Sequence, residues 1–476
     1  MLYAVLRGVA GIALRWYYGR IDVAGAERIP ASGPVLLVAN HPNALVDALV
    51  AAWVAPRRVL LTGKATLFTN PLAAWALRTI GVVPLRRIAD DGAGIADRER
   101  NADAFAKIVD ALVGGGLVLI FPEGKSHDEP AIAPLRSGAA RMSLETQRAL
   151  GDRPLHIVPL GLVFESKETA GSRISAEVGE PIDVRDWVLH DDAPRALTHE
   201  IDRRLRDVTL NHETHAAERW TTSVARRLVR LHAVPRPMAS AQPSLREELG
   251  IARRLQHLSA QLNGDRSTDA HGAGARARDL DQRLAELDAT ATREGIALED
   301  IGIETDARVA RRFAFREVAL LALASPIAWW GEVNHWLPFH AAQWIGARGP
   351  DRVSRDQPAM RAIVSGALLV LGCYLAQTFV VARLTSPPTA LAYLLSLPLA
   401  AEVNFALRAR RREAQRRVRA WTLFQREPAL HRRLLAERDA LRAEVASLEQ
   451  ALSEAAGRDH QGPSATPHAA HLSADP

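Results

Sequence analysis

Cysteine is almost absent from this chain of 476 residues, since Cys373 is its one example. A single cysteine excludes an internal disulfide framework and any cluster of cysteine metal ligands. A signal-peptide cleavage site with small residues is also lacking after the apolar, helically spaced segment Met1–Tyr18, which contains Arg7 and Arg15. This segment predicts an interfacial amphipathic helix at residues 1–20, with a core-packing first helix as the equal alternative.

A recognised nucleic-acid motif is missing too, although the net charge of +6 suits an anionic partner. Nucleic acid, a membrane surface and phosphorylated substrates would all fit this charge. The arginines cluster directly beside apolar segments, where membrane topology explains them. We therefore expect membrane lipids as partners and no nucleic acid.

Charge is absent from two neighbouring apolar runs, residues 362–382 and 384–401. The first is long enough, as a helix, to cross a bilayer core of about 30 Å. Together the runs predict a helical membrane hairpin over 362–401, and a buried helical pair in a soluble domain is the alternative. An earlier run, 318–331, is shorter and leads into Glu332, which favours a re-entrant or interfacial segment. Arginines on both sides of the hairpin predict that its flanks are cytoplasmic.

Short apolar runs alternate with helical periodicity between residues 21 and about 185. We expect strands at 35–39, 59–62, 117–121, 157–164 and 174–178, and helices near 43–55, 70–80, 97–113 and 136–149. This alternation is typical of a layered α/β domain. Ligands in such sheets bind beyond the carboxyl ends of strands, and His41 follows one of those ends.

Four blocks of residues in this region carry the chemical signal. His41 and Asp47 follow the first predicted strand, where a base and its orienting partner can be held. Gly81 begins a segment that ends in Arg86 and Arg87, two guanidinium groups suited to phosphate. The later blocks are Phe121-Pro122-Glu123-Gly124, followed by Lys125-Ser126, and the apolar segment around Pro159.

The ordered set of four resembles the glycerolipid acyltransferase superfamily, over residues 20 to 185. The resemblance implies a mixed sheet flanked by helices, followed here by an α-helical region with the membrane hairpin. It also implies acyl transfer with His41 as the catalytic base, oriented by Asp47. Arg87, with Arg86 or Lys125 as helper, would bind the acceptor phosphate. Glu123 would bind the glycerol hydroxyl or order Arg87, and Gly124 would allow close backbone approach.

The resemblance implies no bound cofactor or metal, and either acyl-CoA or acyl carrier protein as cosubstrate. The expected acceptor is a lysophospholipid, with 1-acylglycerol 3-phosphate first and glycerol 3-phosphate as the alternative. The expected location is the membrane, with the active site facing the cytoplasm. A non-catalytic membrane scaffold that retains the acyltransferase fold is the other alternative.

One departure concerns the first block, because five residues separate His41 from Asp47 where the family usually has four. On a regular helix the extra residue would rotate Asp47 by about 100°. Either the turn after His41 is irregular or the partner geometry differs. The longer spacing also resembles a subgroup with additional membrane segments after the catalytic domain.

The expected organisation has six parts. These are the interfacial helix 1–20, the acyltransferase domain 21–189, a helical connector 190–312 with a flexible linker near 263–274, a membrane region 313–406, a basic helix and short coiled coil 407–456, and a disordered tail 457–476. Leucines one heptad apart at 434, 441 and 448 predict a short coiled coil or an antiparallel helix contact, so residues 434–452 are a candidate segment for self-association.

Overall fold

The computed structural model describes residues 2–69, 71, 74, 77, 81–85, 95–233, 244–264, 268–347 and 357–459. Arg86, Arg87 and residues 460–476 of the predicted tail lie outside this described part. The chain divides into two compact units that each combine segments distant in sequence. The first unit contains residues 1–223, 241–256 and 315–412, and the second contains 224–240, 257–314 and 413–476.

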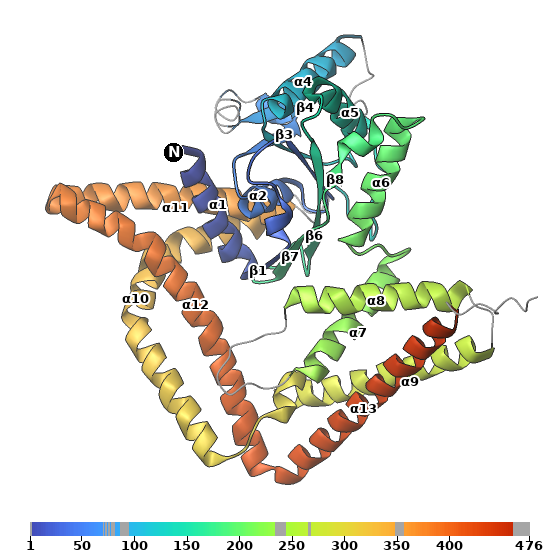
Figure 1. Ribbon diagram of the computed structural model, residues 1–476. Helices are drawn as coiled ribbons and strands as arrows, with labels where there is room; N and C mark the ends of the chain where they lie inside the picture. The colour runs from blue at the N-terminus through green and yellow to red at the C-terminus, as the bar shows by residue number, and fades with distance from the viewer. Residues whose placement is uncertain are drawn as a thin grey trace, which may run out of the picture. The chain divides into compact units, whose positions relative to one another are not determined.

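A mixed sheet forms the centre of the first unit (Figure 1). Its strands are β1 (Arg20–Ala24), β2 (Val35–Ala39), β3 (Val59–Lys64), β4 (Val82–Leu85), β5 (Leu117–Ile120), β6 (His156–Phe164), β7 (Arg173–Val178) and β8 (Ile182–Asp183). The order is β1-β7-β6-β2-β5-β3-β4, with β8 paired to β6. The pairs β6–β7 and β6–β8 are antiparallel and the other described pairs are parallel. The expected mixed α/β fold is confirmed.

Five predicted strands are present, and the sequence missed β1, β4 and β8. Arg20 and Asp22 make β1 polar, and Pro84 interrupts the short apolar run of β4. Both strands lie at the ends of the sheet. Edge strands tolerate polar residues and proline because one of their sides needs no ladder hydrogen bonds. Their patterns are therefore weaker than those of central strands.

Strand β2 separates two hydrophobic cores, one on each face of the sheet. Leu37 and Ala39 belong to the core that includes helices α1 (Leu2–Tyr18) and α2 (Ala44–Val54). Leu36 and Val38 belong to the opposite core, with α4 (Ile95–Val113), α5 (Gly138–Leu150) and α6 (Ala193–Asp207). Alternate side chains of a strand point to opposite faces, so a strand buried on both faces reads as one continuous apolar run.

Helix α1 packs into the first core along one of its faces. Leu14, Tyr17 and Tyr18 are buried, and Gly11 lies against the Trp53 ring of α2. This is the core-packing alternative of the two that the sequence left open. Contact of α1 with a membrane surface stays a prediction.

Within the described residues, three helices are long and apolar enough to cross a membrane: α10 (Ala307–Ala347), α11 (Gln357–Leu384) and α12 (Pro387–Arg426). Pro387 and Pro388 stand at the first turn of α12, where proline costs no hydrogen bond. The predicted hairpin 362–401 thus corresponds to α11 and the first part of α12. The run 318–331 lies inside the continuous helix α10, which is long and apolar enough to span, so its expected re-entrant or interfacial placement stays a prediction. Glu332 did not end the helix because its carboxylate pairs with Arg408 of α12.

The remaining helices are α7 (His215–His232), α8 (Leu245–Gly264), α9 (Thr268–Arg293) and α13 (Pro428–Asp459), and short 3-10 helices cover Ala26–Arg28, Ala65–Phe68, Val184–Trp187 and Leu298–Gly302. The predicted linker near 263–274 therefore includes the last residues of α8 and the first residues of α9. In the second unit, Leu434, Leu441 and Val445 of α13 are buried. Arg283 of α9 pairs with Glu444 of α13 at 2.5 Å, which is a helix contact within the chain. Self-association through 434–452 stays a prediction.

Candidate functional site

His41 and Asp47 meet where β2 passes into α2. The Nδ1 atom of His41 lies 2.9 Å from Asp47 Oδ2. Residues 40–43 are not helical, and Ala44, the first residue of α2, has a φ of 42°. The five-residue spacing is therefore accommodated by an irregular turn, the first of the two possibilities that the sequence left open. Asp47 projects from the first turn of α2, back toward the strand end.

Asn43 ties this turn to α1. Its backbone N–H donates to Asp47 Oδ2 at 2.7 Å, and its side-chain amide donates to the Tyr18 hydroxyl at 2.7 Å. The Tyr18 hydroxyl in turn donates to the carbonyl of Lys167 at 3.0 Å. Asn43 and Tyr18 are both completely buried. A buried polar network with its donors satisfied holds one geometry, so Asp47 Oδ2 is held in place by both His41 and Asn43.

Complete burial raises the pKa of Asp47, because a carboxylate without water is destabilised relative to the neutral acid. The hydrogen bonds from the His41 ring and from the Asn43 backbone oppose this rise. The second oxygen, Oδ1, is buried and has no hydrogen-bond partner in the described part of the chain. The carboxyl group therefore depends on His41 and Asn43 for its charged form.

The imidazole of His41 lies flat against the Phe121 ring, with the ring centroids 3.8 Å apart and the planes 11° apart. The bond to Asp47 favours the tautomer with the proton on Nδ1. No described protein group hydrogen-bonds Nε2. The lone pair of Nε2 is thus available to take a proton from another molecule.

Glu123 is buried directly beside His41 and accepts three hydrogen bonds from the protein. Its Oε1 accepts from the backbone N–H of His41 at 2.8 Å. Its Oε2 accepts from the backbone N–H of Ala133 at 2.9 Å and from His127 Nε2. The Nδ1 atom of His127 accepts from the Glu129 backbone, so the proton of that ring is on Nε2. These contacts make Glu123 an acceptor that holds the turn at His41 and the backbone at Ala133.

Gly124 follows with a φ of 76°, a left-handed conformation that glycine adopts without strain. A Cβ atom there would lie 2.9 Å from Arg136 Nε, so glycine also provides room. Lys125 is exposed and makes no ion pair or hydrogen bond within the described residues. Arg86 and Arg87 lie outside the described residues, so their phosphate-binding role stays a prediction.

Four positioning residues escaped the sequence analysis: Tyr18, Asn43, Phe121 and His127. His127 stands four residues after Glu123 in the same block, which is the one local signal that could have indicated it. Tyr18 comes from a separate helix, and no local pattern connects it with Asn43. Phe121 belongs to the Phe-Pro-Glu-Gly block, but the sequence does not predict that its ring stacks on His41.

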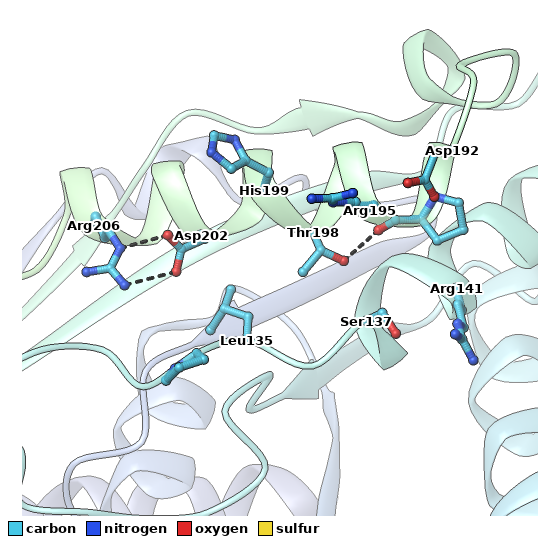
Figure 2. A pocket seen from close by; sticks show the side chains of 11 residues that line it. Leu135, Ser137, Arg141, Asp192, Arg195, Thr198, His199, Asp202 and Arg206 are labelled. Carbon is cyan, nitrogen blue, oxygen red and sulfur yellow. Dashed lines mark hydrogen bonds and ion pairs between the residues drawn. The ribbon is translucent and has the colours of Figure 1, made fainter.

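The loop that carries Ala133 also borders an open groove of about 680 Å³. Figure 2 shows Leu135, Ser137 and Arg141 on one side of the groove and α6 on the other. Arg206 is paired with Asp202 at 2.7 Å, which neutralises that end. The groove does not include any residue of the four sequence blocks. It is therefore separate from the candidate catalytic pair.

Comparison with known proteins gives a consistent result for the region around the pair. A protein-family model named Acyltransferase matches residues 20–163. Glycerol-3-phosphate O-acyltransferase 2 of Saccharomyces cerevisiae is 30% identical over 139 residues, which are 29% of this chain and 19% of that protein. A chloroplastic 1-acyl-sn-glycerol-3-phosphate acyltransferase of Brassica napus is 27% identical over 139 residues, 29% of this chain and 37% of that protein.

The human 1-acyl-sn-glycerol-3-phosphate acyltransferase alpha is 28% identical over 139 residues, covering 28% of this chain and 45% of that protein. A solved 1-acyl-sn-glycerophosphate acyltransferase from Thermotoga maritima is 18% identical, with a TM-score of 0.32 over 43% of this chain and 78% of that structure. The chain spans less than half the length of each of these three curated relatives. Within those bounds, residues 20–163 form an acyltransferase domain of the glycerolipid acyltransferase superfamily.

Proposed function

We propose that this protein is a membrane-bound O-acyltransferase that moves a fatty acyl group from an acyl thioester to a hydroxyl group of a glycerolipid. The observation that carries the proposal is the His41–Asp47 pair within the acyltransferase domain. His41 Nδ1 is engaged by Asp47 at 2.9 Å, and Nε2 has no described protein partner. This is the arrangement of a general base with its orienting carboxylate.

The chemistry follows from these contacts. His41 Nε2 takes the proton of the acceptor hydroxyl as its oxygen attacks the thioester carbonyl. The tetrahedral intermediate collapses to the new ester and expels the thiolate, which receives the proton from His41. Asp47 holds the ring tautomer and stabilises the imidazolium between these two proton transfers. Glu123 fixes the backbone of His41 during both steps.

The first acceptor we propose is 1-acylglycerol 3-phosphate, in agreement with the names of the Brassica and human relatives. Glycerol 3-phosphate is the second, because the yeast relative is named a glycerol-3-phosphate acyltransferase. Arg86 and Arg87 would bind the phosphate, assisted by the exposed Lys125. Acyl-CoA and acyl carrier protein are both compatible donors.

The membrane helices support a lipid acceptor. Ala359, Ala362 and Ile363, near the start of α11, belong to the same hydrophobic core as α1 and α2. The acyltransferase domain is thus packed directly onto one of the apolar helices, so the site stays close to the bilayer that holds a lysolipid tail. Arginines that flank α11 and α12 favour a cytoplasmic active site.

The test is acyl transfer by the full chain in nanodiscs, with labelled acyl-CoA or acyl carrier protein and an acceptor panel of lysophosphatidate, glycerol 3-phosphate and a neutral lysolipid. We expect activity that His41→Ala abolishes and that the control His190→Ala, at an exposed loop position, retains. Activity that is equal in folded His41→Ala and in the wild type would refute the assignment of the base. A wild type inactive with every donor and acceptor would favour the scaffold alternative.

Membrane orientation has a separate test. A cysteine introduced at the exposed Lys125 in a Cys373→Ser background should react with a membrane-impermeant maleimide only when the cytoplasmic face is accessible. Labelling from the opposite face alone would refute the orientation.

A further inference from the structure

A cavity of about 620 Å³ lies in the second unit, between the beginning of α10 and the last part of α12. Its apolar wall includes Ile303, Val309, Phe313, Val418 and Trp421. Small-molecule sites in proteins occupy roughly 300–1,000 Å³ and are lined mainly by apolar side chains. The cavity therefore has the size and lining of a ligand site, and none of its residues belongs to the acyltransferase domain.

Positive charge lies at the edge of this cavity. Arg311 lines it, is exposed, and makes no ion pair within the described residues. Arg417 also lines it, lies 5.9 Å from the Phe313 ring centroid and pairs with Glu413 at 2.7 Å. Glu304 is the one acidic residue of the lining. An arginine without a carboxylate partner beside an apolar cavity suits a ligand with an anionic group and an apolar body.

The helix that forms one wall continues into an apolar segment. After Ala314 of the lining, α10 exposes Phe315 at 80% and Val318 at 65%, with Arg316 and Glu317 between them, and its uncharged run begins at Val318. Such exposure is expected on a helix that enters a bilayer, and α10 is one of the three candidate spans. The cavity residues of α10 thus stand where a membrane helix reaches the head-group level, at which tryptophan and arginine are enriched. A ligand at this level is supplied by the bilayer itself.

We propose that this cavity binds one anionic phospholipid, with an acyl chain among the apolar residues and the phosphate at Arg311 and Arg417. A soluble anion such as a nucleotide would leave the apolar wall unused. A zwitterionic lipid would bring a cationic group toward Arg311. The proposal is independent of acyl transfer, because it uses neither His41 nor any other residue of the candidate active site.

The experiment measures quenching of Trp421 fluorescence in the full chain, reconstituted in phosphatidylcholine nanodiscs. Phosphatidylglycerol with brominated acyl chains is titrated in, and brominated phosphatidylcholine serves as the comparison. The variant Trp421→Phe gives the background from the other tryptophans. We expect saturable quenching at low phosphatidylglycerol content, and only gradual quenching by phosphatidylcholine.

Two variants and one matched control separate a site from general charge attraction. Arg311→Gln with Arg417→Gln should weaken the effect about 30-fold, since each arginine near anionic lipid contributes on the order of a few-fold to tenfold in affinity. Ala310→Phe keeps both arginines and adds no tryptophan but fills the cavity, and should abolish saturable quenching. Arg308→Gln with Arg312→Gln removes equal charge from α10 outside the lining, and should leave quenching within about twofold.

Equal quenching by the two lipids would overturn the proposal. So would a control variant that loses as much affinity as the Arg311 and Arg417 variant, because surface charge alone would then explain binding. Unchanged saturable quenching in Ala310→Phe would exclude the cavity as the place of the acyl chain.

Discussion

Replacing Glu123 by glutamine tests whether this carboxylate positions the base or binds the acceptor. Glu123 accepts from the backbone N–H groups of His41 and Ala133 and from His127 Nε2. A glutamine has one acceptor oxygen and one NH₂ group at the two positions. Whichever way the amide is turned, its NH₂ faces at least one buried donor. The substitution keeps the shape of the side chain and removes a single acceptor.

The size of the effect follows from that loss. A buried donor without an acceptor costs about 1–3 kcal/mol. A decrease of this size in the free energy of unfolding lowers the Tm by a few degrees in a domain of this size. If the orphaned donor is the His41 N–H, the ring of His41 shifts, and a misplacement of about 1 Å costs roughly 100-fold in rate. We therefore expect Glu123→Gln to lower kcat by about 10- to 100-fold, with little change in the KM of the acceptor.

Steady-state kinetics with varied acceptor, together with thermal unfolding, measure both effects. Glu145→Gln on the exposed face of α5 is the matched control and should change neither quantity. His127→Leu removes one of the donors to the same carboxylate. Because the two side chains act through one contact network, the double variant Glu123→Gln with His127→Leu should lose less than the sum of the single effects.

A different result would refute the positioning role. If Glu123 bound the acceptor hydroxyl, Glu123→Gln would raise the KM of the acceptor and leave the Tm unchanged. Strictly additive losses in the double variant would also contradict a shared network.

Three further substitutions have defined outcomes. Asp47→Asn should reduce kcat/KM by about 10²- to 10⁴-fold, because the imidazolium loses its counter-charge. Burial raises the pKa of Asp47, so ionisation of this carboxyl lowers the stability of the folded wild type as the pH rises through that pKa. The Tm of the variant relative to that of the wild type should therefore increase from pH 4 to 8, and a decrease would contradict this reasoning. Gly124→Ala, at a φ of 76°, should lower both activity and Tm. The control Gly151→Ala, at a φ of 62° with nothing within 4 Å of the added Cβ, should lower the Tm slightly and leave activity unchanged. Equal effects of the two substitutions would contradict a special role of the turn at Gly124. Gly331→Leu should destabilise the packing of α10 on α12 and lower the Tm measured in detergent, because even a Cβ would lie 2.3 Å from the carbonyl oxygen of Ala400. The control Gly372→Leu, with nothing within 4 Å of the added Cβ, should leave this Tm unchanged.

The proposed catalytic pair could be predicted from the sequence because both members follow one strand end. His41 and Asp47 are six positions apart, so the turn between β2 and α2 brings them together without any distant contact. The geometry of Asp47 could not be predicted, since the extra residue is accommodated by the irregular turn at Asn43 and Ala44. That turn is fixed by Tyr18, which lies 25 positions before Asn43 in another helix. Long-range contacts of this kind have no periodic signal in one sequence.

Long-range contacts also explain which of the long apolar helices could be predicted from the sequence. Length and lack of charge were sufficient to predict α11 and the start of α12. Helix α10 was underestimated because Glu332 was treated as the end of an apolar run. In the structure Glu332 is paired with Arg408 and also accepts from Asn404, both on α12. A charge that is paired with a neighbouring helix does not end an apolar helix, but the partner is 76 positions away.

Helix α1 connects these two parts of the first unit. Tyr18 at its end accepts a hydrogen bond from the side chain of Asn43, and the backbone N–H of Asn43 donates to Asp47. One turn earlier, Trp16 stacks on Phe339 of α10 with centroids 4.7 Å apart, and Arg15 pairs with Glu402 of α12 at 2.6 Å. A helix whose sequence resembles a surface anchor thus contacts the turn that carries Asn43 and also two apolar helices. Because buried, directional contacts transmit position, loss of the Tyr18 hydroxyl should reduce kcat of the full chain even though Tyr18 touches neither His41 nor a substrate.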